Sequence, residues 1–254
     1  MNYVYISDFF VEDILGGGEI NDSVVIEELL NKGHEVFKYR SSFVTKEIID
    51  KNKNNNFIIS NFINLSESVK NYIQDNCSYI IYEHDHKYLR TRNPALYKDF
   101  IAPTQHIINE QFYKNALAIF CQSRFHCDIV RRNLFTDNIK NVGGNAWSEE
   151  SLSVIRSMIK KDKKDLFSIM DSNIPHKNTN GSINYCKYKK ENYDLIKDNV
   201  YYSFLDKLSR NKKMVFLPQT PETLSRVLVE ARMMDIEVHT NSNVGATYEK
   251  WFSK

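Results

Sequence analysis

Short apolar runs alternate with longer amphipathic runs from the first residues of this chain. The runs "YVYIS" at 3–7 and "HEVFKYR" at 34–40 are typical of strands, and "SVVIEELLNKG" at 23–33 has the apolar spacing of a helix. A strand, a helix and a second strand in this order form a βαβ unit, in which the two strands run parallel. The alternation therefore favours a mostly parallel sheet with helices on both faces, which is an α/β fold.

The same alternation continues along the chain and restarts after Asn145. Further strands are expected at 57–62, 78–83, 117–123, 165–172, 214–218 and 237–242, and further helices from near Ser66, at 106–113, 148–161 and 180–190, and after Pro221. A break near 142–165 separates the two series. We predict two domains, 1–150 and 151–254, of which the second is abbreviated.

Composition excludes several classes of protein. With 254 residues, 42% of them hydrophobic, the chain can bury one large core or two modest ones. Its net charge of +2 is spread along the sequence, so nothing indicates nucleic acid. Cys77, Cys121, Cys127 and Cys186 lack paired spacing and are expected to be reduced thiols. No run approaches the roughly 20 apolar residues of a membrane span, and no signal peptide begins the chain. We expect a cytoplasmic protein.

A glycine-rich stretch, "LGGGEINDS" at 15–23, joins the first strand to the first helix. Gly16, Gly17 and Gly18 would let the backbone approach a ligand closely and take positive φ. The spacing is not G-x-G-x-x-G, and "FKYRSS" offers no acidic residue at the end of the second strand, which argues against a nicotinamide-dependent oxidoreductase. A phosphate-binding loop and a flexible turn both remain open.

A polar stretch, "YEHDHKYLRTRNP" at 82–94, follows a predicted buried strand. The carboxyl ends of such strands are where open α/β sheets place their ligands. Consecutive residues at a strand end point alternately, so Glu83, His84, Asp85 and His86 cannot all reach one metal ion. Substrate contact is favoured over a metal site, and a solvated polar strand end is the alternative.

A third connection, "DSNIPHKNTNGS" at 171–182, again joins a strand to a helix. Lys177 is its one cation, and a lysine in such a position can act as a point charge for phosphate. The alternative is an ordinary solvated lysine.

The stretch "LPQTPETLSRVLVEARMM" at 217–234 places two carboxylates in a largely apolar helix. Pro221 and Glu222 suit a helix N-terminus, where proline is preorganised and a carboxylate is favoured by the helix dipole. If both residues are helical, Glu230 lies about 80° around and about 12 Å along the axis from Glu222. Because its neighbours are apolar, Glu230 is expected to be buried and to need a partner, for which a ligand hydroxyl is one answer.

Together these stretches resemble a known family. A strand, "PxxPE", seven residues and a second glutamate are similar to the donor-binding segment of retaining glycosyltransferases of the GT-B fold. "GGGE" at 16–19 is similar to the glycine-rich loop of that family, and "HKNTNGSINYC" at 176–186 to its lysine-containing segment. The resemblance implies two Rossmann-like domains with parallel sheets, the acceptor binding to the first and the nucleotide sugar to the second.

The resemblance also implies roles for individual residues. Glu222 would contact hydroxyls of the transferred sugar, Glu230 the ribose, and Lys177 the diphosphate. Asp85 or a flanking histidine would face the acceptor. The implied catalytic residues are Glu222, Lys177 and Asp85; the donor-binding residues are Gly17, Gly18, Asn173, Lys177, Glu222, Thr223, Leu224 and Glu230; the acceptor-binding residues are His84 and His86.

The activity implied by the resemblance is transfer of a hexose-like sugar from a nucleotide sugar, with retention of anomeric configuration. Neither a metal nor a cofactor is expected, and the donor would be UDP- or GDP-linked. The acceptor could be a glycan, a lipid-linked molecule or a protein, and no nucleic acid partner is expected. The alternative is a non-catalytic module with the same fold that binds sugar nucleotides or glycans.

Overall fold

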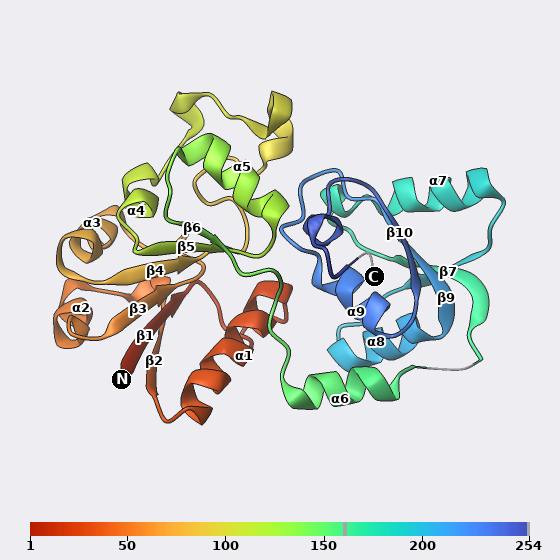
Figure 1. Ribbon diagram of the computed structural model, residues 1–254, viewed down its shortest axis with the longest axis horizontal. Helices are drawn as coiled ribbons and strands as arrows, with labels where there is room; N and C mark the ends of the chain where they lie inside the picture. Colours follow the sequence, from red (N-terminus) through yellow and green to blue (C-terminus); the bar gives the residue numbers. More distant parts are fainter. Residues whose placement is uncertain (160–161, 253–254) are drawn as a thin grey trace. The chain divides into compact units, whose positions relative to one another are not determined.

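The computed structural model describes residues 1–159 and 162–252 (Figure 1). The chain divides into two compact units, Met1–Ala146 and Trp147–Lys254. Both are α/β, and all the strand pairs within their sheets are parallel, as predicted from the alternation. The acceptor and donor roles expected for the two domains stay predictions.

The first unit contains a six-stranded sheet in the order β2-β1-β3-β4-β5-β6. Its strands are β1 (Asn2–Ser7), β2 (Glu35–Arg40), β3 (Asn56–Ile59), β4 (Tyr79–Tyr82), β5 (Ala118–Cys121) and β6 (Ile139–Asn141). Its helices are α1 (Gly17–Asn31), α2 (Lys46–Asn52), α3 (Glu67–Asn76), α4 (Glu110–Lys114) and α5 (Arg124–Leu134).

Alternation along β1 explains why this sheet is covered on both faces. Val4 and Ile6 pack into a core with side chains of α2, α3, α4 and α5, whereas Tyr5 faces the opposite way and packs with Ile26 of α1. Figure 1 shows α1 on one side of the sheet and α4 and α5 on the other. Burial of both faces accounts for the nearly continuous apolar runs of the central strands.

The second unit contains a four-stranded sheet in the order β10-β9-β7-β8. Its strands are β7 (Lys164–Met170), β8 (Tyr193–Ile196), β9 (Asn211–Phe216) and β10 (Glu237–Thr240), and its helices are α6 (Glu149–Ser157), α7 (Thr179–Lys189), α8 (Tyr201–Ser209) and α9 (Arg226–Met233). Met214 and Phe216 of β9 pack with α8 and α9, whereas Val215 packs with Cys186 of α7.

Several elements differ from the sequence-based expectation. Helix α1 begins at Gly17 and not at Ser23, so the glycine stretch forms its first turn. Helix α6 ends at Ser157, and residues 160–161 of the expected helix lie outside the described residues. Strand β8 was not predicted because it is a four-residue edge strand with exposed Leu195, so it lacks an apolar run.

Three further helices, α2, α5 and α8, and strand β6 were also missed. Helix α5 carried a readable signal, since Ser123 caps it by accepting a hydrogen bond from the backbone N–H of His126, and its apolar residues have helical spacing. Helix α2 is likewise capped, by Thr45. Strand β6 has only three residues, two of them exposed, and leaves little trace in the sequence.

The two sheets share a feature that positions ligands. In the first unit β2 and β3 flank β1, and in the second β8 and β9 flank β7, so the chain reverses its direction of strand addition beside the first strand of each unit. Open parallel sheets bind ligands at the carboxyl edge beside such a reversal. The connections after β1 and β3, and those after β7 and β9, are therefore the places to look for chemistry.

Among the described residues, no helix is both long and apolar enough to cross a bilayer.

Candidate functional site

The connections that follow β7 and β9 are joined at the carboxyl edge of the second sheet. Asn178, which precedes α7, donates from its side-chain amide to the Leu217 carbonyl at 2.8 Å, and its Oδ1 accepts from the backbone N–H of Gly181 at 3.2 Å. A Cβ on Gly181 would lie 2.2 Å from the Asn178 side chain, so this contact requires glycine. The Gln219 backbone N–H also donates to the His176 carbonyl.

Lys177 and Glu222 meet within this junction. The Lys177 Nζ lies 2.7 Å from Glu222 Oε1, and their side chains are 25% and 15% exposed, so the pair is partly shielded yet reachable. The ammonium also lies 5.7 Å from the centre of the Phe216 ring. Burial, and then the charge of Lys177, lower the pKa of the neighbouring His176, which favours the neutral imidazole. The sequence-predicted lysine and first glutamate therefore lie together.

The backbone around Glu222 differs from the expectation. Helix α9 begins at Arg226, so Glu222 precedes the helix instead of opening it. Glu222 forms an isolated parallel bridge with Val244: its N–H donates to the Asn243 carbonyl at 2.7 Å, and its own carbonyl accepts from Gly245. This bridge fixes the carboxylate beside Lys177. The prediction that the helix dipole favours Glu222, and the 80° and 12 Å relation to Glu230, are therefore wrong.

Ser225 explains why the helix starts late. It lies immediately before α9 in the left-handed region, with φ of 74°, and its buried hydroxyl has no hydrogen-bond partner among the described residues. Thr223 is half-buried and Leu224 is buried in the core, where the Leu224 carbonyl accepts from Ala246. Asn173 is exposed in the connection after β7. The donor-binding roles of these three predicted residues stay predictions.

Replacement of Ser225 by glycine should stabilise the protein. Left-handed φ costs a residue with a Cβ about 1–2 kcal/mol, and the unpartnered hydroxyl adds to this, while glycine loses part of the gain to chain entropy. We expect the free energy of unfolding to rise by about 1 kcal/mol for Ser225→Gly, measured by denaturant titration. Ser225→Ala removes the hydroxyl but keeps the strained backbone, so a gain equal to that of glycine would contradict this explanation.

Glu230 is buried, as predicted, but its partners belong to the protein. Its Oε1 lies 2.8 Å from Arg226 Nε and accepts from Trp147 Nε1 at 3.0 Å and from the Tyr201 hydroxyl. The Arg226 guanidinium lies 4.4 Å from the centre of the Trp147 ring. Burial raises the pKa of Glu230, and the charge of Arg226 and these hydrogen bonds oppose the rise. The partner expected for this carboxylate is therefore supplied by protein side chains, and a ligand hydroxyl is not required to satisfy it.

In the first unit, the glycine stretch caps α1. Gly16 is the N-cap, and Gly17 and Gly18 are the first two helical residues. Positive φ was expected there, but among the described glycines only Gly33 and Gly143 have it. Gly18 is instead close to its neighbour, since a Cβ on it would lie 3.4 Å from the His84 ring. The stretch brings backbone N–H groups of a helix N-terminus to the carboxyl edge beside β1.

His84 lies in a buried hydrogen-bond network. Its Nε2 lies 2.6 Å from Asp22 of α1 and its Nδ1 lies 2.7 Å from the Gln122 side chain. The Asp22 carboxylate also accepts from Tyr5 and Ser60. With both ring nitrogens engaged and the side chain only 6% exposed, His84 is held in place beneath the first turn of α1. Its acceptor-binding role stays a prediction, and this burial counts against it.

Asp85 belongs to a cluster of charges. Lys87, which is buried, donates to Asp85 at 2.8 Å and to buried Glu83 at 2.6 Å, and Arg92 also pairs with Asp85. Burial alone would raise the pKa of Asp85, but the charges of Lys87 and Arg92 outweigh it and hold the pKa well below its usual range. Asp85 is therefore suited to accept a hydrogen bond and poorly suited to act as a general base.

His86 is buried and neutral. Burial lowers its pKa to about 4. Its Nδ1 contacts the Tyr88 hydroxyl at 2.9 Å, while its Nε2 has no hydrogen-bond partner in the part of the chain that the structure describes. His126, whose pKa burial also lowers, packs edge-on against it. Because His86 is buried and does not reach solvent, its predicted acceptor role has no support from its position.

Stability of the protein should fall as pH drops from about 6.5 to about 4 because of His86. The unfolded chain takes up a proton near the ordinary pKa of 6.5, whereas the folded protein resists until about 4. The loss would reach at most roughly 3 kcal/mol. Unfolding free energies of the wild type and of His86→Gln, measured across this range, should converge at low pH. Parallel curves would contradict the assignment.

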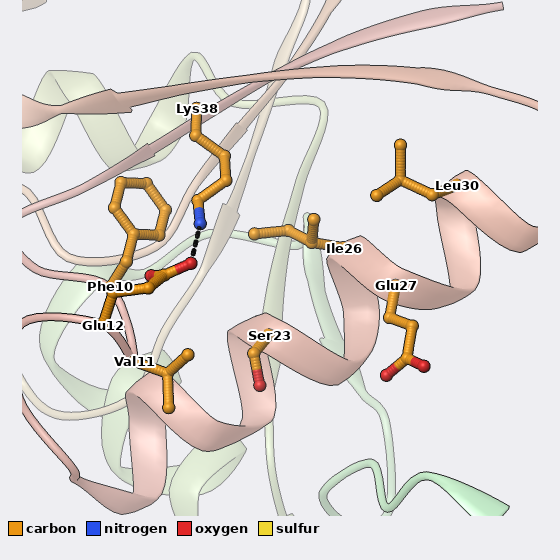
Figure 2. A pocket seen from close by; sticks show the side chains of 8 residues that line it. All are labelled: Phe10, Val11, Glu12, Ser23, Ile26, Glu27, Leu30 and Lys38. Atoms are coloured by element: carbon orange, nitrogen blue, oxygen red, sulfur yellow. Dashed lines mark hydrogen bonds and ion pairs between the residues drawn. The ribbon is translucent and has the colours of Figure 1, made fainter.

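A cavity of about 240 Å³ lies elsewhere in the first unit, and no sequence-predicted site residue lines it. Figure 2 shows its walls: α1 on one side and the start of the β1–α1 connection with Lys38 of β2 on the other. The apolar part consists of Phe10, Val11, Ile26 and Leu30, and the polar part of Glu12, Ser23, Glu27 and Lys38.

Among residues 1–159 and 162–252, no three His, Cys, Asp or Glu side chains lie together in a way that could hold an ion.

Some residues of these networks were missed from the sequence. The Arg226–Glu230 pair carried a signal, since i,i+4 spacing places the two side chains on one helix face. Asn178 also carried one, as an N-cap three residues before Gly181. Asp22, Gln122, Trp147 and Tyr201 carried none, because their partners come from distant segments.

No protein-family model matches the sequence, and no curated protein does. Solved structures do match it. HepE of Anabaena, in complex with UDP and glucose, is 10% identical, with a TM-score of 0.60 over 96% of this chain and 82% of HepE. An alpha-glucosyltransferase in complex with UDP and a 13-mer DNA is 11% identical, with a TM-score of 0.55 over 94% and 79%.

A glycosyltransferase from Rickettsia africae is also similar, at 11% identity and a TM-score of 0.53 over 97% of this chain and 80% of that protein. Identities this low establish the fold alone. The fold predicted from the paired-glutamate resemblance is confirmed: the chain has the two-domain, Rossmann-like fold of GT-B glycosyltransferases.

Proposed function

We propose that this protein is a glycosyltransferase that takes a sugar from a nucleotide donor and retains its anomeric configuration. The observation that carries the proposal is the contact between Lys177 and Glu222, 2.7 Å apart at the carboxyl edge beside the β7/β9 reversal. A cation and a carboxylate held at this edge are what a negatively charged diphosphate and a hydroxyl-rich sugar require. Similar folds solved with UDP, or with UDP and glucose, support a uridine nucleotide as the donor.

Binding of the donor would separate the Lys177–Glu222 ion pair and give each of the two side chains a new partner on the donor. In the protein alone, each charge neutralises the other. A diphosphate arriving near Lys177 would take over the ammonium, and Glu222 would then be free to accept hydrogen bonds from sugar hydroxyls. Because Glu222 is held through its backbone by Asn243 and Gly245, its carboxylate would keep its position during the exchange.

Lys177 would act mainly on the leaving group. When the bond from the sugar to the diphosphate breaks, negative charge develops on the phosphate oxygens, and a fixed cation stabilises that charge. We infer that no metal is needed for this step and that the departing phosphate takes the acceptor proton. Asp85, which stays ionised beside Lys87 and Arg92, would orient an acceptor hydroxyl by accepting its hydrogen bond.

We also place the protein in the cytoplasm. All four cysteines are free thiols, and three of them are buried. Burial raises the pKa of Cys77 to about 11, so even this more accessible thiol stays protonated and unreactive at neutral pH.

Donor turnover is the decisive experiment. We expect UDP to stabilise the protein against thermal unfolding more than GDP, and a UDP-sugar to be hydrolysed slowly without an acceptor. Release of UDP, followed in a coupled assay, and the configuration of the sugar product, read by NMR, test transfer and retention. Binding of UDP-sugars without any release of UDP would instead support a non-catalytic binding module. No stabilisation by any nucleoside diphosphate would overturn both.

A further inference from the structure

The connection between β1 and α1 is unusually apolar. It runs from Asp8 to Gly16 and contains five large apolar residues: Phe9, Phe10, Val11, Ile14 and Leu15. Three of them are exposed, Phe9 by 41%, Ile14 by 48% and Leu15 by 51%. Surface connections are normally polar, because exposed apolar groups gain nothing from folding.

The neighbouring connections add two more exposed apolar side chains. Phe43, after β2, is 66% exposed, and Ile63, after β3, is 52% exposed. Strands β2, β1 and β3 are adjacent and parallel, so the three connections begin at the same edge of the sheet. We call Phe9, Ile14, Leu15, Phe43 and Ile63 the apolar rim.

Asp8 holds the parts of the rim together. It follows β1 directly, is 6% exposed, and accepts hydrogen bonds from the backbone N–H groups of Ile63 at 2.9 Å and Asn64 at 3.0 Å. It also accepts from the Ser41 hydroxyl, two residues before Phe43. One buried carboxylate therefore links all three connections, which holds their backbones in fixed positions relative to one another. Such preorganisation lowers the entropic cost of binding.

Charges beside the rim are neutralised in pairs. Lys38 contacts Glu12 at 2.5 Å, as Figure 2 shows, and Arg40 pairs with Asp13. Two further apolar residues of the β1–α1 connection, Phe10 and Val11, line the cavity between this connection and α1. An uncharged apolar group therefore suits this surface better than a phosphate or an acidic peptide.

We propose that the apolar rim binds the hydrocarbon part of the acceptor, so that the acceptor is a lipid-like molecule. The inference rests on the proposed function. Ile14 and Leu15 of the rim lie just before the glycine stretch at 16–18, and all three connections begin at the edge where open α/β sheets receive their substrates. Its aliphatic and phenyl side chains offer no hydrogen bonds to the hydroxyls of a glycan. Burial of a hydrocarbon chain needs only such apolar surface.

Short n-alkyl glucosides with two to eight carbons, below their micelle concentrations, are suitable probes. We expect their affinity, measured by NMR titration, to rise about threefold per added methylene, near the upper value for full burial. Phe43→Ser/Ile63→Ser should remove most of this dependence on chain length. The matched control, Leu117→Ser/Phe135→Ser, changes residues that are 68% and 80% exposed outside the rim and should preserve it. Ile63→Asn alone serves if the double variant fails to fold.

Donor hydrolysis separates the two proposals. If Phe43→Ser/Ile63→Ser loses the dependence of affinity on chain length but releases UDP at the wild-type rate, the result supports alkyl binding by the apolar rim. Chain-length dependence without any UDP release would sink the proposed function but leave an alkyl-binding surface. Affinity independent of chain length, or equal loss in the control variant, overturns the rim. Rim-dependent sedimentation with phosphatidylcholine vesicles, or rim-dependent dimerisation, in the absence of alkyl glucoside binding would also overturn it, in favour of a bilayer or a second copy.

Discussion

Replacing Lys177 by methionine is expected to lower kcat about 10²–10³-fold with UDP-sugar as donor. This range is typical for loss of a single group that stabilises developing negative charge. Methionine has a similar length, so the packing beside Phe216 is largely kept while the charge is lost. The free energy of unfolding should change by at most about 1 kcal/mol, because the pair with Glu222 is partly exposed.

Lys189, at the far end of the helix that follows Lys177, provides the control. Lys189 is exposed in the last turn of α7, and its ammonium lies over the Tyr188 ring. Lys189→Met removes the same charge and should leave kcat unchanged. An equal fall in both variants would show that net charge, and not position, matters. A normal kcat in Lys177→Met would remove the leaving-group role.

Glu222→Gln separates the two members of the pair. If Glu222 binds sugar hydroxyls, loss of its carboxylate charge should raise KM and lower kcat for the nucleotide sugar. The affinity for UDP alone should stay nearly unchanged. Lys177→Met should instead lower the affinity for UDP itself. The contrast is informative because the two residues contact each other in the protein alone, so a merely structural pair would give two variants with the same defect.

The sequence was sufficient for the fold class because the central strands of both sheets follow a local rule. Central strands such as β1 are apolar on both faces and alternate with capped or amphipathic helices, and neither signal depends on distant residues. The start of α9 was not predictable in the same way. It depends on Ser225 taking left-handed φ in "TLSR", where no glycine or asparagine marks the position.

The site was predictable only where spacing along the chain carried the information. Lys177 and Glu222 follow neighbouring strands, so parallel topology brings them to one edge. By contrast, Asp85 is paired internally by Lys87 and Arg92, and Glu230 meets Trp147 from 83 residues away. A carboxylate in an apolar helix indicates that a partner exists, but its sequence context does not say whether that partner is a ligand or the protein.

Glu230→Gln is expected to destabilise the protein by about 3–5 kcal/mol, because it removes the carboxylate that pairs with the buried Arg226 guanidinium at 2.8 Å. Arg226→Met should be costly for the converse reason. In the double variant both charges are absent, and part of the loss should be recovered. Denaturant titrations of the four proteins give the coupling energy, and a coupling near zero would contradict the ion pair.

The same variants decide whether Glu230 also binds ribose. Trp147, Tyr201 and Arg226 all reach Oε1, so a ribose hydroxyl would have to use Oε2. Trp147→Phe removes a donor to Oε1 and leaves Oε2 in place. If ribose binds there, Glu230→Gln should lower the affinity for UDP at least tenfold more than Trp147→Phe does. Both affinities are measured at temperatures where the two variants are fully folded. If the two affect UDP equally, the carboxylate serves the packing of Trp147 and α9, and the nucleotide is bound by other groups.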